Sequence, residues 1–285
     1  MVNLKIAIQK SGRLRDDSLT LLKECGIFVD NDRDQLMAEA SNFNMEVLYL
    51  RNSDIPQYVR DGVVDIAIIG SNTMVEKNMG IIEVLKLGFS RCRLSIAVPK
   101  NVEFSGIEWL KGKRIATSYP NSLKEFLISH DISGEIHEIS GSVEIAPNIG
   151  LADAICDIVS SGSTLFKNGL QEVYKIFESE ALLATNPNLS PEKEKLLEKL
   201  VFRIKSVLAS QNNKYILLNA PKKSLDRICA LIPGMKSPTV LPLTDPEWVS
   251  IHSVVRENDF WEVVDALKKA GAQGILIIPI EKMIM

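Results

Sequence analysis

A run of small hydroxylated residues at positions 160–164 has the composition of a phosphate-binding loop. It reads Ser-Ser-Gly-Ser-Thr and follows residues 155–159, an apolar segment that predicts a short buried strand. A helix is expected to begin at Thr164, so that loop N–H groups and the helix N-terminus converge on one point. Small side chains let the backbone approach an anion. The residues expected to contact a phosphate are Ser160, Ser161, Gly162, Ser163 and Thr164.

One carboxylate lies just before this loop. Asp157 is one step inside the end of the expected strand, where it could hold sugar hydroxyls or a metal ion. Asp153, earlier in the segment, is equally consistent with an exposed helix residue. The alternative for the whole segment is a polar turn with Thr164 as the N-cap of a helix. The acid and the buried strand favour the phosphate interpretation.

A second cluster of charge follows the first expected strand, residues 4–9. It reads Lys10-Ser11-Gly12-Arg13-Leu14-Arg15, and a helix is expected from about residue 16 to 25. Three cations around a glycine at a strand–helix junction suit a polyphosphate, although a solvated basic turn explains them equally well.

A third candidate segment ends a continuous apolar strand, residues 65–70, of the kind buried in parallel sheets. Gly70 and Ser71 lie at its carboxyl end, where open α/β sheets bind ligands. The same pattern occurs in two-lobed solute receptors of the periplasmic type, so it indicates a two-lobed α/β fold before it indicates an enzyme.

The remaining elements of residues 1–212 alternate between strand and helix. Strands are expected at 45–50, 94–98, 113–117, 135–139 and 180–185, and helices at 54–61, 121–129, near 147–153 and, as one long amphipathic helix, at 192–210. We expect one lobe from residues 1–93 with 180–212, and a second lobe with the phosphate loop from 94–179.

Residues 213–285 predict a separate unit with the order βαββαβ, the ferredoxin-like arrangement. Strands are expected at 215–218, 239–243, 249–255 and 275–280, and helices at 225–231 and 260–270. This unit has neither a nucleophile–base pair nor metal-ligand spacing. A regulatory or assembly role is therefore expected for it.

Composition excludes several classes of function. The 285 residues suffice for two or three domains, and a net charge of −3 argues against a nucleic-acid partner. The four cysteines lie far apart without a CxxC pair, as in a reduced cytosolic protein. The first strand leaves no room for a signal peptide, and no apolar run is long enough to span a membrane. We therefore expect a cytoplasmic location and no membrane partner.

Four segments carry a family resemblance. Gln-Lys-Ser-Gly-Arg-Leu at 9–14, Gly-Ser-Val-Glu at 141–144, the loop at 160–164 and Pro-Gly-Met-Lys-Ser-Pro-Thr at 233–239 closely resemble motifs of the ATP phosphoribosyltransferases. The resemblance covers essentially the whole chain and includes Ile-Pro-Ile-Glu-Lys-Met at 278–283. It implies the long form of this family: a two-lobed, periplasmic-binding-protein-like catalytic core followed by a ferredoxin-like, ACT-like domain.

The resemblance also implies an activity. Enzymes of this family transfer the phosphoribosyl group of phosphoribosyl pyrophosphate to N1 of ATP, which releases pyrophosphate in the first step of histidine biosynthesis. Magnesium is expected to arrive with the substrate phosphates, since no dedicated metal cage is visible. Histidine is expected to inhibit, and dimers that gather into hexamers are expected. Two alternatives stay open: a non-catalytic sensing module, and a regulatory subunit that has lost its active site.

Residue roles follow from the same resemblance. Asp157, Lys10 and Arg15 are the expected catalytic residues, and Glu144 joins Asp157 and the loop in binding phosphoribosyl pyrophosphate. The expected contacts of ATP or pyrophosphate are Lys10, Gly12, Arg13, Arg15, Gly70 and Ser71. The expected histidine contacts are Met235, Ser237, Thr239 and Gly274, whereas Asn219 is doubtful because an acid would pair better with an amino group.

Overall fold

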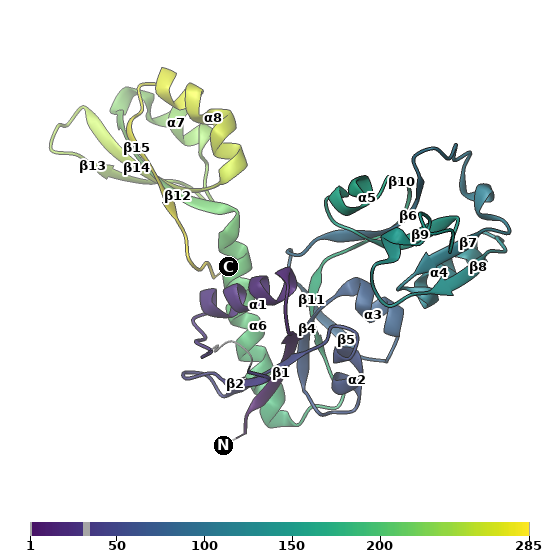
Figure 1. Ribbon diagram of the computed structural model, residues 1–285. Helices are drawn as coiled ribbons and strands as arrows, with labels where there is room; N and C mark the ends of the chain where they lie inside the picture. Colours follow the sequence, from purple (N-terminus) through teal and green to yellow (C-terminus); the bar gives the residue numbers. More distant parts are fainter. Residues whose placement is uncertain (1, 31–34, 285) are drawn as a thin grey trace. The chain divides into compact units, whose positions relative to one another are not determined.

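The computed structural model describes residues 2–30 and 35–284, which divide into two compact units, 1–197 and 198–285. The first unit contains two α/β lobes, each built on its own sheet, and the second contains one four-stranded sheet (Figure 1). The predicted fold class is confirmed. The finer division at residues 93, 180 and 213 stays a prediction.

Lobe I is built on a six-stranded sheet in the order β2-β3-β1-β4-β11-β5. Strands β1, β3 and β4 are parallel, so their carboxyl ends lie at one edge. Their apolar residues are almost all buried, as expected of continuous apolar strands. The elements are β1 (Leu4–Gln9), α1 (Arg13–Glu24), β2 (Met37–Glu39), β3 (Met45–Leu50), α2 (Ile55–Arg60), β4 (Ile66–Gly70), α3 (Ser71–Lys77), β5 (Ile82–Lys86) and β11 (Ala181–Thr185).

Lobe II is built on a five-stranded sheet in the order β10-β6-β9-β7-β8 (Figure 1). Its first strand, β6, pairs antiparallel with both β10 and β9, and β7 lies parallel to β8 and β9. The elements are β6 (Cys92–Pro99), a 3₁₀ turn η1 (Ile107–Leu110), β7 (Arg114–Thr117), α4 (Pro120–Ser129), β8 (Glu135–Glu138), a 3₁₀ turn η2 (Val143–Ile145), β9 (Ala154–Val159), α5 (Ser163–Lys167) and β10 (Leu170–Ser179).

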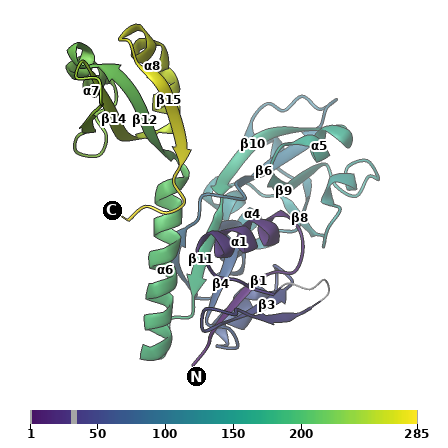
Figure 2. The same ribbon diagram turned by 90° about the vertical axis from the view of Figure 1, so that its left-hand side faces the viewer.

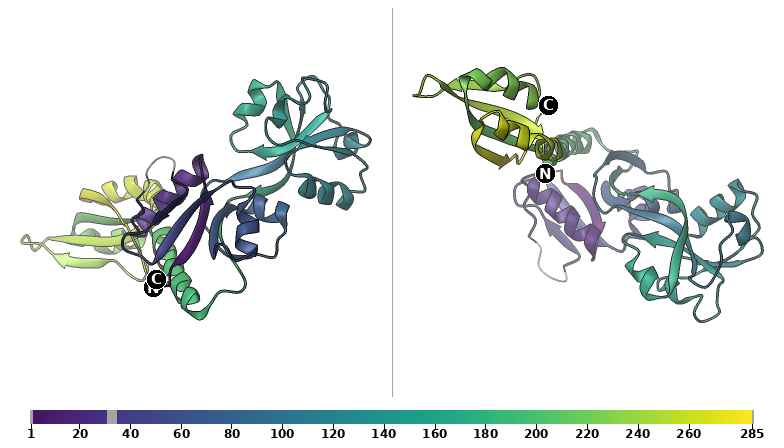
Figure 3. Two further views of the ribbon diagram at one scale, coloured as in Figure 1. Left: turned by 60° about the horizontal axis from the view of Figure 1, so that its bottom comes forward. Right: turned by 90° about the horizontal axis from the view of Figure 1, so that it is seen from above.

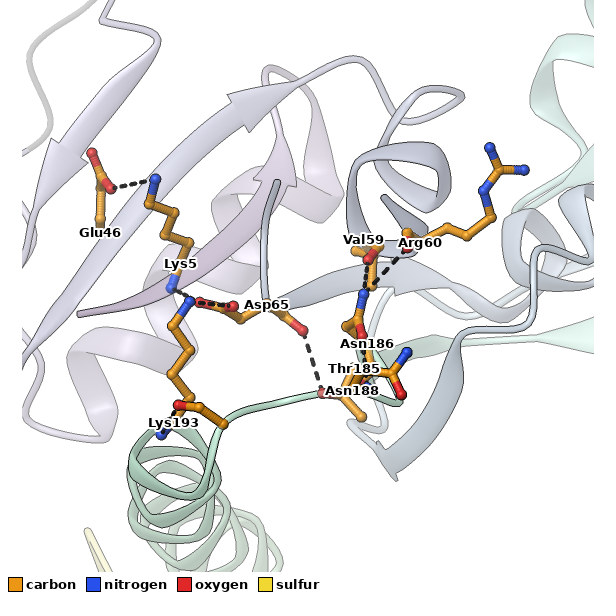
Figure 4. A network of polar contacts seen from close by, with 10 residues as sticks. Lys5, Glu46, Val59, Arg60, Asp65, Thr185, Asn186, Asn188 and Lys193 are labelled. Carbon is orange, nitrogen blue, oxygen red and sulfur yellow. Dashed lines mark hydrogen bonds and ion pairs between the residues drawn. The ribbon is translucent and has the colours of Figure 1, made fainter. Parts of the chain in front are cut away.

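The chain crosses twice between the lobes, before β6 and after β10. Helix α6 (Pro191–Gln211) follows β11 and is one continuous helix (Figure 2). Its first turns are tied to lobe I by Asp65, which is only 5% exposed. The Asp65 carboxylate accepts hydrogen bonds from Lys193 Nζ at 2.7 Å and from the backbone N–H of Lys5 at 2.8 Å (Figure 4). A buried carboxylate with both oxygens paired fixes where this helix begins.

The second unit has the predicted βαββαβ order. Its sheet runs β13-β14-β12-β15, all antiparallel, and α7 and α8 cover one face of it (Figure 3). Buried residues of that face, such as Ile216, Leu218 and Ile251, form a core with Phe260 of α8. The elements are β12 (Asn213–Pro221), η3 (Lys222–Ser224), α7 (Leu225–Leu231), β13 (Thr239–Pro242), β14 (Trp248–Arg256), α8 (Glu257–Lys269) and β15 (Gln273–Pro279).

Two local predictions are wrong. The helix expected near 147–153 does not form; this segment is turns, and Gly150 has a left-handed φ of 73°, which a helix does not accommodate. Helix α5 begins at Ser163, one residue before the predicted start at Thr164, and its N-cap is Gly162, which also excludes the alternative of Thr164 as N-cap. In the described part of the chain, the four cysteines form no disulfide, and no helix is long and apolar enough to cross a bilayer.

Candidate active site

The hydroxylated loop connects β9 to the short helix α5. Gly162 has φ 77°, in the left-handed region that favours glycine, and this turn directs the chain into the helix. The Ser161 hydroxyl donates to Ser163 Oγ at 3.0 Å, which ties the two sides of the turn together. A cavity of about 130 Å³ lies inside it, and its polar lining is Glu144, Asp157, Ser160, Ser161, Gly162 and Thr164. All but one of the predicted phosphate contacts therefore line one hollow.

Asp157 is one of the two acidic residues that line this cavity. Its Oδ1 accepts a hydrogen bond from the Ile158 N–H at 2.8 Å. Burial raises the pKa of the Asp157 carboxyl to about 6; the hydrogen bond from Ile158 opposes this rise, and the negative charge of Glu144 adds to it. A carboxyl whose pKa is strongly raised and which lines a cavity is a candidate for ligand binding.

Asp153, the other acid of this segment, has a structural role. Its carboxylate accepts hydrogen bonds from Arg114 Nη2 at 3.0 Å and Nε at 3.3 Å, and from the Arg114 backbone N–H at 2.9 Å. The pKa of Asp153 is lowered by these bonds. The pair closes the amino-terminal end of β9, opposite the phosphate loop.

The basic turn after β1 reaches the phosphate loop through Arg13. Arg13 Nη1 donates to Ser160 Oγ at 3.3 Å, across 147 positions of sequence, and Nη2 donates to the Arg91 carbonyl at 3.4 Å. Gly12, with φ 89°, is the N-cap of α1 and places Arg13 in the first turn. Lys10 is exposed beside it. One of the predicted cations therefore contacts the loop directly.

Arg15 packs against lobe I. Its guanidinium lies over the ring of Tyr49 on β3, 5.2 Å from the ring centroid, and its side chain is 22% exposed. Burial raises the pKa of the Tyr49 hydroxyl, and the Arg15 charge partly offsets this. Arg15 is thus held within lobe I, where its charge contributes to the potential of the carboxyl edge of the sheet.

A larger cavity of about 550 Å³ adjoins the phosphate loop where the lobes meet. Ser71 and Ser179 line it, with the Ser71 hydroxyl donating to Ser179 Oγ at 3.0 Å, and Ser160 borders both cavities. Gly70 precedes Ser71 at the end of β4. Three cations also line the cavity, none of which was predicted as a site residue: Lys86, Arg91 and Arg93. Arg91-Cys92-Arg93 is visible in the sequence, but only as the start of a strand.

Two contacts across the lobes hold this arrangement together. Glu76 of α3, 4% exposed, accepts hydrogen bonds at the N-terminus of α4: from Asn121 N at 3.0 Å, Ser122 N at 2.9 Å and Ser122 Oγ at 2.7 Å. Asn72 Nδ2 donates to the Tyr119 hydroxyl at 3.0 Å. A carboxylate of one lobe thus caps a helix of the other, where the helix dipole favours negative charge.

Comparison with known proteins identifies the family. The family model "ATP phosphoribosyltransferase" matches residues 51–206, and "HisG, C-terminal domain" matches residues 210–282. An ATP phosphoribosyltransferase of Cytophaga hutchinsonii is 57% identical over 99% of this chain and 98% of its own length, and one of Parabacteroides distasonis is 53% identical over 99% and 100%. The chain belongs to the ATP phosphoribosyltransferase family.

A solved structure supports the same assignment. A chain of the "ATP phosphoribosyl transferase (HisG:HisZ) complex from Thermotoga maritima" is 32% identical, with a TM-score of 0.61, over 71% of this chain and 98% of that one. The protein is therefore a transferase of the glycosyltransferase class that acts on ATP and phosphoribosyl pyrophosphate in histidine biosynthesis. The predicted catalytic activity is confirmed over the two non-catalytic alternatives.

The residues predicted for ATP phosphoribosyltransferase regulation do not form one cluster in this chain. Met235 lines a cavity of about 400 Å³ with Gly234 and Phe260. Thr239 begins β13, and Ser237 is exposed just before it. Gly274 lies on β15, at the opposite edge of the sheet, beside Asn219. Two intervening strands separate the edges, a distance of about 14 Å at about 4.8 Å per strand.

Within residues 2–30 and 35–284, no group of three or more His, Cys, Asp or Glu side chains is placed to hold a metal ion. Asp157 and Glu144, which line the phosphate cavity together, are the acids nearest the loop. One or two carboxylates with substrate phosphates is the usual setting for Mg²⁺. Phosphoribosyltransferases as a family generally need a divalent metal ion, and these two acids are the candidates to meet one here.

Proposed function

We propose that the phosphate loop binds the ribose 5-phosphate part of phosphoribosyl pyrophosphate, and that the adjoining interlobe cavity receives the phosphates of ATP and pyrophosphate. The contact of Arg13 with Ser160 carries this proposal, because it joins the predicted polyphosphate turn to the predicted sugar-phosphate loop. Ser160, which borders both cavities, would lie between the two anionic groups. The reacting sugar would then lie between the lobes.

The individual roles follow from the chemistry of each group. Backbone N–H groups and hydroxyls of residues 160–164 would hold the 5-phosphate. Asp157, with Glu144 beside it, would accept hydrogen bonds from the ribose hydroxyls. Lys10 and Arg13, with the field of Arg15, would balance the charge of ATP and pyrophosphate. Gly12, Gly70 and Ser71 would let backbone and small side chains approach those phosphates.

The reaction is a displacement at the anomeric carbon. N1 of adenine attacks this carbon, the bond to pyrophosphate breaks, and the leaving group departs with the electron pair of that bond. Because pyrophosphate is a good leaving group, the protein mainly aligns two anions and stabilises charge as the bond breaks. Alignment alone can contribute about 7–11 kcal/mol. The contact of Glu76 with α4 supports such alignment, since it fixes one lobe against the other.

The metal, the regulator and the assembly belong to the same proposal. We assign the divalent ion as Mg²⁺, whose charge would neutralise the pyrophosphate group. Residues 213–285 would sense histidine through Met235, Ser237, Thr239 and Gly274. These residues lie at opposite edges of the sheet, so one histidine could contact residues of both edges only if a second copy of the chain supplied one edge. This supports a homo-oligomer, a dimer or hexamer. A cytoplasmic location suits substrates that are too charged to cross a membrane.

Turnover of Mg-ATP and phosphoribosyl pyrophosphate, followed by the absorbance of phosphoribosyl-ATP, tests the activity. The site assignment is tested by Gly162→Val, which puts a branched side chain into the phosphate cavity. Gly169→Val is the matched control, because Gly169 also has a left-handed φ (71°) but lies after α5 and does not line that cavity. We expect Gly162→Val to abolish turnover and Gly169→Val to retain it. Equal activities would contradict the assignment.

A further inference from the structure

Arg93 holds the first residue of the phosphate loop by its backbone. Arg93 lies on β6, and its Nη1 donates to the carbonyl oxygen of Ser160 at 3.2 Å. Its other nitrogens grip Glu172 of β10: Nε donates to Oε1 at 2.5 Å, and Nη2 donates to Oε2. The Ser95 hydroxyl donates to Oε1 of Glu172 at 2.8 Å, so the carboxylate is itself held in place.

This geometry directs the loop. A bidentate pair with a carboxylate fixes the plane of a guanidinium, so the two N–H groups of the remaining nitrogen point in fixed directions within that plane. One of these N–H groups meets the Ser160 carbonyl. Because a peptide unit is planar and trans, a Ser160 C=O held toward Arg93 turns the N–H of Ser161 the opposite way. Arg93 thereby sets the direction of one of the loop donors.

The pair is half-buried, which makes its bonds persistent. The side chains of Arg93 and Glu172 are 32% and 24% exposed. The Arg93 hydrogen bonds lower the pKa of Glu172, so the carboxylate stays charged at neutral pH. Exposed ion pairs of this kind contribute little, whereas a bidentate pair in partial burial restricts both partners.

We propose that Arg93, oriented by Glu172, is a positioning residue that preorganises the phosphate loop for the 5-phosphate of the ribose donor. This inference rests on the proposed role of the loop. It names the residue pair that keeps the loop in its binding conformation before the donor arrives. Preorganisation of this kind raises affinity because the ordering cost is not incurred on binding.

The chain offers a matched control for this pair. Arg114 and Asp153 form a similar two-pronged arginine–carboxylate contact on the same sheet, and Arg114 Nη1 likewise donates to a backbone carbonyl, that of Gly150, at 2.9 Å. This pair lies at the other end of β9, away from the loop. Replacing either arginine removes two hydrogen bonds to a carboxylate and one to a backbone carbonyl, but only Arg93 contacts Ser160.

The experiment measures binding of ribose 5-phosphate, which carries the phosphate but no pyrophosphate. The variants are Arg93→Met, Glu172→Met, the double Arg93→Met/Glu172→Met, and Arg114→Met as the control. We expect at least tenfold weaker binding in Arg93→Met and in the double variant, weaker binding in Glu172→Met, and unchanged affinity in Arg114→Met. We also expect the KM for phosphoribosyl pyrophosphate to rise in step.

The double variant separates positioning from mere stability. Arg93→Met alone leaves the Glu172 carboxylate without its arginine partner, so we expect the melting temperature of this variant to fall. The double variant removes both charges and should recover much of the lost melting temperature. Affinity for ribose 5-phosphate should stay low in the double variant. Recovery of affinity there, a normal affinity in Arg93→Met, or an equal loss in Arg114→Met would overturn the proposal. If Gly162→Val instead bound ribose 5-phosphate normally, the loop assignment itself would fail.

Discussion

Replacing Asp157 by Asn should make the protein more stable and the enzyme much less active. The native carboxyl has a pKa of about 6, against an ordinary value of 3.8, because its partial burial disfavours the charged form. For an acid whose folded pKa is raised, the folded state binds the proton more tightly than the unfolded state. The carboxyl therefore does not lower the free energy of unfolding below about pH 4. The loss grows as the pH rises through 6 and reaches its full size above about pH 7.

The magnitude follows from the shift. Each pKa unit corresponds to about 1.4 kcal/mol, so ionised Asp157 destabilises lobe II by about 2–3 kcal/mol at pH 8. An Asn side chain keeps an oxygen that accepts from the Ile158 N–H but carries no charge. The free energy of unfolding of Asp157→Asn should thus exceed that of the wild type by about 2–3 kcal/mol at pH 8. At pH 4 the two free energies should be about equal.

The assay is urea unfolding followed by the fluorescence of Trp109, which packs against Phe104 within lobe II. The other tryptophans, Trp248 and Trp261, are replaced by Phe in every variant so that the signal reports this lobe. In the same samples, kcat/KM for phosphoribosyl pyrophosphate should fall by about 10- to 100-fold, the value of a hydrogen bond to a charged group. A stability difference that is absent at pH 8, or is the same at pH 4, would refute the reasoning.

Three further outcomes are expected. Glu76→Ala leaves the N–H and hydroxyl of Ser122 without their acceptor, so it should lower the free energy of unfolding by about 2–4 kcal/mol in urea titrations. The KM of both substrates should rise, and unchanged KM values would count against alignment of the lobes by this contact. Lys193→Met leaves the Asp65 carboxylate half-paired and should destabilise lobe I by about 3 kcal/mol by the same measurement, whereas the double variant Asp65→Asn/Lys193→Met should lose less. Deletion of residues 213–285 should abolish inhibition by histidine in the turnover assay, and a deletion variant that is still inhibited would refute the regulatory role.

The sequence predicts those elements whose own residues determine them. Strands β1 and β3 have the expected bounds because each is an apolar run between polar turns. Strand β10 was not predicted, since two irregularities in its pairing with β6, after Glu172 and after Lys175, break the alternation that marks a half-buried strand. Helix α1 begins three residues earlier than expected because Gly12, not the acidic pair that follows, is its N-cap.

The candidate site divides in the same way. The loop at 160–164 and Asp157 are local in sequence, so composition and order were enough to predict that they line one site. Arg93 was not found, because its partners are Ser160, 67 positions away, and Glu172, 79 positions away. Only the pairing of β6 with β9 and β10 brings these three together. Contacts that depend on sheet topology have no signature in a single sequence.

A crystal structure with ribose 5-phosphate bound tests the central claim most directly. The account predicts the phosphate in the 130 Å³ cavity, with its oxygens about 2.7–3.2 Å from N–H and hydroxyl groups of residues 160–164, and the sugar hydroxyls facing Asp157. A phosphate bound elsewhere in the protein, with this cavity unoccupied, would contradict it.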